Sequence, residues 1–141
     1  MSFPEISKKQ ILDTFKDVQI HNGDLIYVAS YIPILGPSSS VIVDILDGLK
    51  ECVGRDGTIV MPAFNWDYCS SNQMDIENTP SKVGVLTEYF RKSNNVMRSE
   101  APPWCTFSSW GKLAKEISEI KGISPFGCDS IPQYLYDKNV K

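Results

Sequence analysis

The chain has 141 residues, of which 42% are hydrophobic and 22% charged, and this length and composition suit one globular domain with its own core. Its net charge of -3 and the lack of a long apolar run lead us to expect neither nucleic acid nor a membrane as a partner. Because the four cysteines lack C-x-x-C spacing and there is one histidine, we expect no metal site and a cytoplasmic protein with reduced cysteines.

The first third of the chain predicts a helix, a strand and a second helix. Ser7 and Gln10 have the spacing of a capping box, followed by apolar residues at helical spacing. Residues 25–30 are expected to form a buried strand. The serines at 38–40 offer N-caps for a helix that ends near Cys52.

The segment that follows completes a β-α-β unit. Gly54 can end the second helix in a left-handed conformation, and residues 58–61 are a β-branched run typical of a buried parallel strand. Pro62 stops this strand because it cannot donate to a ladder. The predicted fold is therefore α/β, with a layered, mostly parallel sheet and helices on both faces.

Ligands of such sheets bind where the strands end, so the residues after Pro62 should lie at the rim of a crevice. We expect Asn65 and Asp67 to contact a substrate there. Asp67 and Asp75 could receive a cationic ligand, although solvated loop acids are the simpler interpretation. Residues 63–80 form a long polar loop, which in compact domains is usually functional or mobile.

The second half predicts shorter elements. A helix from Ser81 to about Ser93 should turn Leu86, Tyr89 and Phe90 inward. The remaining expected elements are strands at 96–98 and 106–110, a helix at 112–120 and a last helix that starts at Ser130.

The last residues are expected to begin another strand at Val140. A domain that stopped there would leave a sheet edge unpaired. We therefore expect residues 1–141 to be a single α/β domain that is the N-terminal part of a longer protein. The alternative is a naturally short homologue whose edge is exposed or paired in a homodimer.

The order of motifs resembles the aminoglycoside 3-N-acetyltransferase family. Residues 79–91 match its T-P-S-x-x-G-x-L-x-E-x-F-R segment, and residues 125–130 match its P-F-G-x-x-S. Residues 23–30, 54–64 and 98–99 also follow in the family's order. The resemblance implies transfer of an acetyl group from acetyl-CoA, without a metal, to a small-molecule amine, often on an aminosugar.

The resemblance also implies roles for single residues. The CoA arm would be held by Ser30, Tyr31, Ile32, Gly36, Ser39 and Ser40. Independently of the resemblance, the serine-rich helix start at 38–40 suggests an anion site, with simple capping as the alternative. Glu88 would be the acidic residue of the active site, so Glu88→Gln should reduce turnover with little change in melting temperature.

Several positions depart from the family pattern. Ala29-Ser30 stands where the family has His-Ser, the histidines that usually follow Arg98-Ser99 are replaced, and the family's Asn-Thr-x-x-His motif would lie beyond Lys141. His21 matches no family position. Two alternatives thus stay open: a degenerate relative that binds CoA or a partner protein without turnover, and a phosphate-ligand domain of an unrelated family.

Overall fold

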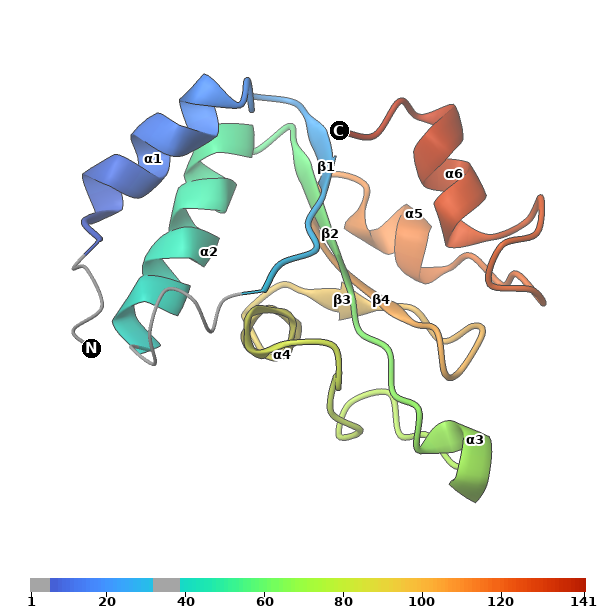
Figure 1. Ribbon diagram of the computed structural model, residues 1–141. Coiled ribbons are helices and arrows are strands. Elements are labelled where there is room, and N and C mark those ends of the chain that lie inside the picture. Colours follow the sequence, from blue (N-terminus) through green and yellow to red (C-terminus); the bar gives the residue numbers. More distant parts are fainter. Residues whose placement is uncertain (1–5, 32–38) are drawn as a thin grey trace.

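A computed structural model describes residues 6–31 and 39–141, which form one mixed sheet flanked by helices (Figure 1). The elements along the chain are α1 (Lys8–Asp17), β1 (Leu25–Tyr27), α2 (Ser39–Val53), β2 (Thr58–Pro62), α3 (Tyr68–Ser71), α4 (Val85–Arg91), β3 (Met97–Arg98), β4 (Phe107–Gly111), α5 (Ala114–Ser118) and α6 (Ile131–Asp137).

The sheet confirms the α/β class but corrects its expected direction. Its strand order is β1-β2-β4-β3. Only β1 and β2 pair in parallel among the described strands, whereas β4 runs antiparallel to both β2 and β3. The expectation of a mostly parallel sheet is therefore wrong for the part of the chain described here. The reason is that β4 follows β3 after a loop through Pro102-Pro103 and runs back beside it, which needs no helical crossover.

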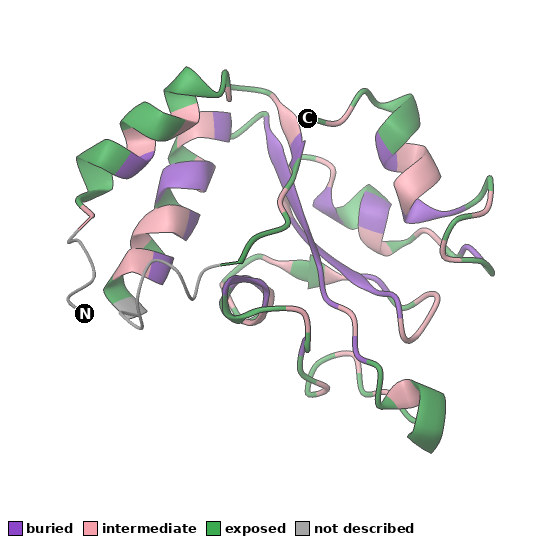
Figure 2. Ribbon diagram, in the orientation of Figure 1, coloured by how far each residue is buried: buried purple, intermediate pink, exposed green. Residues whose placement is uncertain are grey.

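Hydrophobic clusters cover both faces of the central strand. All five residues of β2 are buried. Ile59 and Met61 pack with apolar residues of α2 and α4, while Val60 packs with those of α5 and α6. In Figure 1, α1 and α2 lie on one side of the sheet and α5 and α6 on the other, and β2 is one of the purple strands between them in Figure 2. Because successive side chains of β2 point to opposite faces, both faces of the strand are anchored in hydrophobic clusters. The loop that begins after Pro62 therefore starts from a fixed position.

Local signals set most element ends as expected. Ser7 and Gln10 form both hydrogen bonds of the capping box. Gly54 has φ +65°, a left-handed conformation that glycine adopts without the strain of a Cβ. Ser130 caps α6 by accepting a hydrogen bond from Gln133 N–H.

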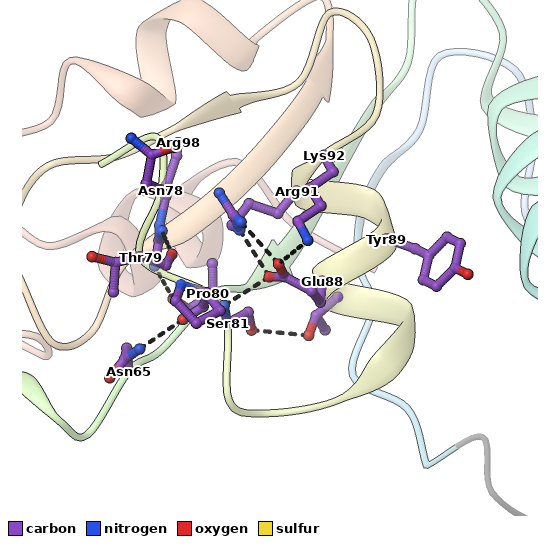
Figure 3. A network of polar contacts seen from close by, with 12 residues as sticks. Asn65, Asn78, Thr79, Pro80, Ser81, Glu88, Tyr89, Arg91, Lys92 and Arg98 are labelled. Carbon is purple, nitrogen blue, oxygen red and sulfur yellow. Dashed lines mark hydrogen bonds and ion pairs between the residues drawn. The ribbon is translucent and has the colours of Figure 1, made fainter. Parts of the chain in front are cut away.

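Three local expectations are corrected. The first strand ends at Tyr27, and Ile26 is its only buried residue. The helix expected from Ser81 begins only at Val85, because Gly84 has φ +150° and precedes it as a non-helical cap. Tyr89 is 44% exposed and points away from the core (Figure 3).

The final residues lie against the open edge of β1. Lys141 N–H donates to Leu25 O at 2.9 Å, and Lys141 O accepts from Tyr27 N–H at 2.8 Å. The Lys141 ammonium also contacts Asp24 Oδ2 at 2.8 Å. Lys141 thus pairs with β1 through two backbone hydrogen bonds, and the expected strand at Val140 stays a prediction.

Candidate active site

Glu88, on the first turn of α4, lies at the centre of a compact polar cluster that we call the Glu88 cluster: Ser81, Glu88, Arg91 and Lys92 (Figure 3). Glu88 Oε2 accepts hydrogen bonds from Ser81 N–H at 2.7 Å and from Arg91 Nε at 2.8 Å. Glu88 Oε1 accepts from Arg91 Nη2 at 2.8 Å and contacts Lys92 Nζ at 3.0 Å. The two carboxylate oxygens therefore have all four of their usual acceptor positions filled.

This arrangement determines the charge of Glu88. Burial raises the pKa of the carboxyl, but hydrogen bonds from Arg91, Ser81 and Lys92 outweigh it and bring this pKa to about 2. A carboxylate with so low a pKa is ionised throughout the physiological range and is a poor proton acceptor. The geometry thus favours a fixed negative charge over a general base. Lys92 is the most easily displaced of the partners, because its side chain is 66% exposed.

The start of α4 lies against the loop that leaves β1. A Cβ on Gly84 would be 3.8 Å from Ser30 O, so the two backbones approach closely at this point. Ser30 and Tyr31 are exposed, whereas Ile32 and Gly36 lie outside the described residues. Ser39 and Ser40 begin α2. Of the expected CoA-binding residues, Ser30 therefore lies beside the start of the helix that carries Glu88, and Ser39 and Ser40 follow the undescribed segment.

Asn65 is buried, with 1% of its surface exposed, and its side chain connects two parts of the long loop. Its Nδ2 donates to Pro80 O at 2.8 Å, and its Oδ1 accepts from Asp67 N–H at 2.8 Å. This contact set positions the loop. A direct contact between Asn65 and a substrate stays a prediction.

Asp67 lies on an open polar cavity of about 520 Å³, which we call the acidic hollow. Its lining residues are Asn65, Asp67, Ser71, Gln73, Met74, Asp75, Thr79 and Pro80. The Asp67 carboxylate forms an ion pair with Lys82 Nζ. The Asp75 carboxylate instead accepts hydrogen bonds from Asn78 and from Glu77 N–H, which lower its pKa without neutralising its charge.

Arg98, for which we predicted no role, connects the loop that lines the hollow to two other segments of the chain. Its guanidinium donates to Thr106 Oγ1 at 2.9 Å and to Ala63 O at 2.7 Å. It also donates to the loop carbonyls of Ile76 and Thr79. Burial and the nearby Arg91 charge lower the pKa of Arg98 to about 10, so it remains protonated at neutral pH. These four acceptors come from three separated segments, and none is a carboxylate.

The remaining titratable candidates contribute little to this region. His21 lies at an exposed turn, with Nδ1 3.8 Å from Asp24 Oδ2. Burial raises the pKa of the Cys105 thiol to about 11, so this cysteine is protonated and a poor nucleophile. Among residues 6–31 and 39–141, no group of three or more His, Cys, Asp or Glu side chains could hold a metal ion. No helix in the same ranges has the length and apolar character needed to cross a bilayer.

The aminoglycoside 3-N-acetyltransferase family model matches residues 28–141, which is most of the chain. The chain belongs to this family. The match contradicts the alternative of a phosphate-ligand domain from an unrelated family. The matched range includes the start of α2, the acidic hollow and the Glu88 cluster.

Solved structures share this fold at low sequence identity. The aminoglycoside acetyltransferase AAC(3)-IVa apoenzyme has a TM-score of 0.85 and 21% identity, over 97% of this chain and 53% of that one. AAC-IIIb, solved as a binary complex with CoASH, has a TM-score of 0.82 and 18% identity, over 97% and 57%. The YokD protein from Bacillus subtilis has a TM-score of 0.82 and 24% identity, over 94% and 61%. The present chain thus spans little more than half the length of these family-fold structures.

Proposed function

We propose that this chain is the N-terminal part of an acetyl-CoA-dependent N-acetyltransferase that acts on an amine of an aminoglycoside or aminosugar. The observation that carries the proposal is the family match over residues 28–141. The chemistry of the hollow supports it, because Asp67 and Asp75 offer negative charge to a cationic amine where the chain leaves β2.

The proposed cosubstrate is acetyl-CoA, with its phosphates at the start of α2. The partial positive charge of a helix N-terminus suits a phosphate, and Ser30, Tyr31, Ile32, Gly36, Ser39 and Ser40 are the residues we assign to this contact. That AAC-IIIb was solved with CoASH is consistent with a CoA-type cosubstrate in this family.

Acetyl transfer needs a neutral amine, since a protonated amine has no lone pair to attack the thioester. A general base must therefore remove a proton, and donors must stabilise the tetrahedral oxyanion. We assign Glu88 the role of a fixed anion that orients the base or the cationic amine after Lys92 is displaced. The only histidine of these 141 residues is His21, so we propose that the base comes from outside them.

Calorimetric titration of CoA into the chain tests the cosubstrate assignment. Ser39→Glu should weaken CoA binding at least tenfold, because it adds a negative charge at the proposed phosphate site. Ser124→Glu is the matched control, since it makes the same charge change in the exposed loop before α6. Equal affinities for the two variants would contradict the assignment.

A second function is favoured by one observation. All four acceptor positions of Glu88 are filled by protein donors, which fits a relative that binds CoA without turnover. Incubation of the chain with acetyl-CoA and a panel of aminosugars, followed by assay of free thiol, tests whether these 141 residues contain their own base. We expect the 141-residue chain alone to release no thiol above the hydrolysis background, whereas turnover would show that it contains its own base.

A further inference from the structure

One candidate substrate contact is already occupied by the protein's own cation. Lys82 Nζ forms an ion pair with Asp67 Oδ2 at the rim of the acidic hollow. The backbone of Lys82 is fixed by its N–H, which donates to Phe64 O at 2.9 Å. The lysine side chain therefore starts from a defined place beside the carboxylate.

The pair is accessible to solvent at both ends. The Lys82 side chain is 45% exposed and that of Asp67 is 63% exposed, so water and salt screen their attraction. A second ammonium can thus replace Lys82 without exposing a buried charge. The contrast with Arg91 is direct, because the Arg91 side chain is only 6% exposed and binds Glu88 through two nitrogens.

Asp67 and Asp75, the two acids of the hollow, therefore differ in whether a cation of the protein balances their charge. Asp75 accepts hydrogen bonds only from neutral N–H groups of Glu77 and Asn78, so its charge remains available to a ligand. Asp67 has its charge balanced by Lys82. A cation that uses both acids must first displace the lysine.

We propose that Lys82 is a specificity-determining residue, which competes with the ammonium groups of the acceptor for Asp67. This inference rests on the proposed function, because it assumes that the amine binds in the acidic hollow. Its consequence is a substrate class: the site favours aminosugars with a single ammonium over polycationic aminoglycosides. Each additional ammonium gains less where an internal lysine already balances the carboxylate.

The experiment compares two lysine variants that change the net charge equally. Lys82→Met removes the competitor, and Lys112→Met is the control. Lys112 forms an exposed ion pair with Asp56 at 3.5 Å, at the opposite end of β2. Neomycin is the polycationic probe and glucosamine the singly charged one, both titrated by calorimetry at low and physiological salt.

We expect Lys82→Met to bind neomycin about threefold to fivefold more tightly than the wild type, the range of a released exposed ion pair. Glucosamine affinity should change by less than about twofold, and Lys112→Met should match the wild type with both probes. In an Asp67→Asn background, Lys82→Met should have no further effect, because the carboxylate over which the two cations compete is gone.

Three results would overturn the inference: equal neomycin affinities for the two lysine variants, an undiminished Lys82→Met effect in the Asp67→Asn background, or no neomycin binding by wild type and Lys82→Met alike. A CoA titration on the same samples distinguishes failure of this inference from failure of the proposed function. If CoA binds, only the role of Lys82 is lost; if CoA also fails to bind, the proposed function fails with it.

Discussion

Glu88 and Asp67 are two carboxylates to which we assign roles in the proposed function, and their surroundings differ sharply. The Glu88 side chain is 20% exposed and has donors on every acceptor position. The Asp67 side chain is 63% exposed and has one exposed lysine as its side-chain partner. The comparison teaches that the acid in the family motif is held by several partners within the fold, while Asp67 has a single exposed cation that a ligand can displace.

The largest effect should come from removing the charge of Glu88. Glu88→Gln leaves the guanidinium of Arg91, 6% exposed, without its counter-charge, so we expect a loss of about 3 kcal/mol in the free energy of unfolding. Urea denaturation measures this loss, with Glu51→Gln as the exposed control. The sequence alone predicted little change in stability for this substitution, and a loss below about 1 kcal/mol would favour that prediction.

A somewhat smaller effect is expected at Arg98. Arg98→Lys keeps the positive charge but cannot reach all four acceptors, which lie around a planar fork. We expect a loss of about 2 kcal/mol, with faster amide exchange at Glu77 to Thr79. The control is Arg55→Lys at an exposed turn. Unchanged exchange in the loop would show that the Asn65–Pro80 contact is sufficient to hold it.

The pH dependence of stability isolates Glu88 from the other acids. Its pKa is lowered from 4.5 to about 2 in the folded chain, so its contribution is fully present above the unfolded pKa and is lost as the pH falls from about 4.5 towards 2. Between these values the unfolded chain binds more protons, and stability rises with pH by up to about 1.4 kcal/mol per pH unit from this group. The Glu88→Gln variant should show a correspondingly flatter profile, and parallel profiles would contradict the low pKa.

The smallest effect is expected at Asp67. Asp67→Asn removes one screened surface pair, so the free energy of unfolding should change by less than about 0.5 kcal/mol. The same urea titration measures it. A loss comparable with that of Glu88→Gln would remove the distinction between the two acids, because Asp67 would then be part of the framework.

The sequence predicted local features better than pairings between distant segments. The caps at Ser7 and Ser130 and the turn at Gly54 depend on a few adjacent residues, and all three were found as expected. The antiparallel direction of β4 depends on contacts that no local pattern encodes. Tyr89 was placed inward because helical spacing identifies a stripe but not its edges.

The candidate site was predictable in outline only. The loop after β2 and the acids Asp67 and Asp75 follow from strand polarity. The role of Arg98 could not be predicted, because three of its four acceptors are backbone carbonyls. Every residue has such a carbonyl, so the sequence does not show which ones accept from Arg98. Asn65 was expected at the rim of the crevice because it follows the strand that ends at Pro62, but its amide connects two parts of the loop instead, and a contact with substrate stays a prediction.

The central position of β2 has a consequence for how the protein is made. When Thr58–Pro62 leaves the ribosome, β1 is available to pair with it, but β4 begins only at Phe107. At usual elongation rates the second edge of β2 waits on the order of seconds for its partner. During that time an uncharged, β-prone segment is open to strands of neighbouring nascent chains. Slow codons between these two strands should therefore lower the soluble yield of this protein, because they lengthen the exposure of β2. Chaperones that cover β2 during this time should raise the yield.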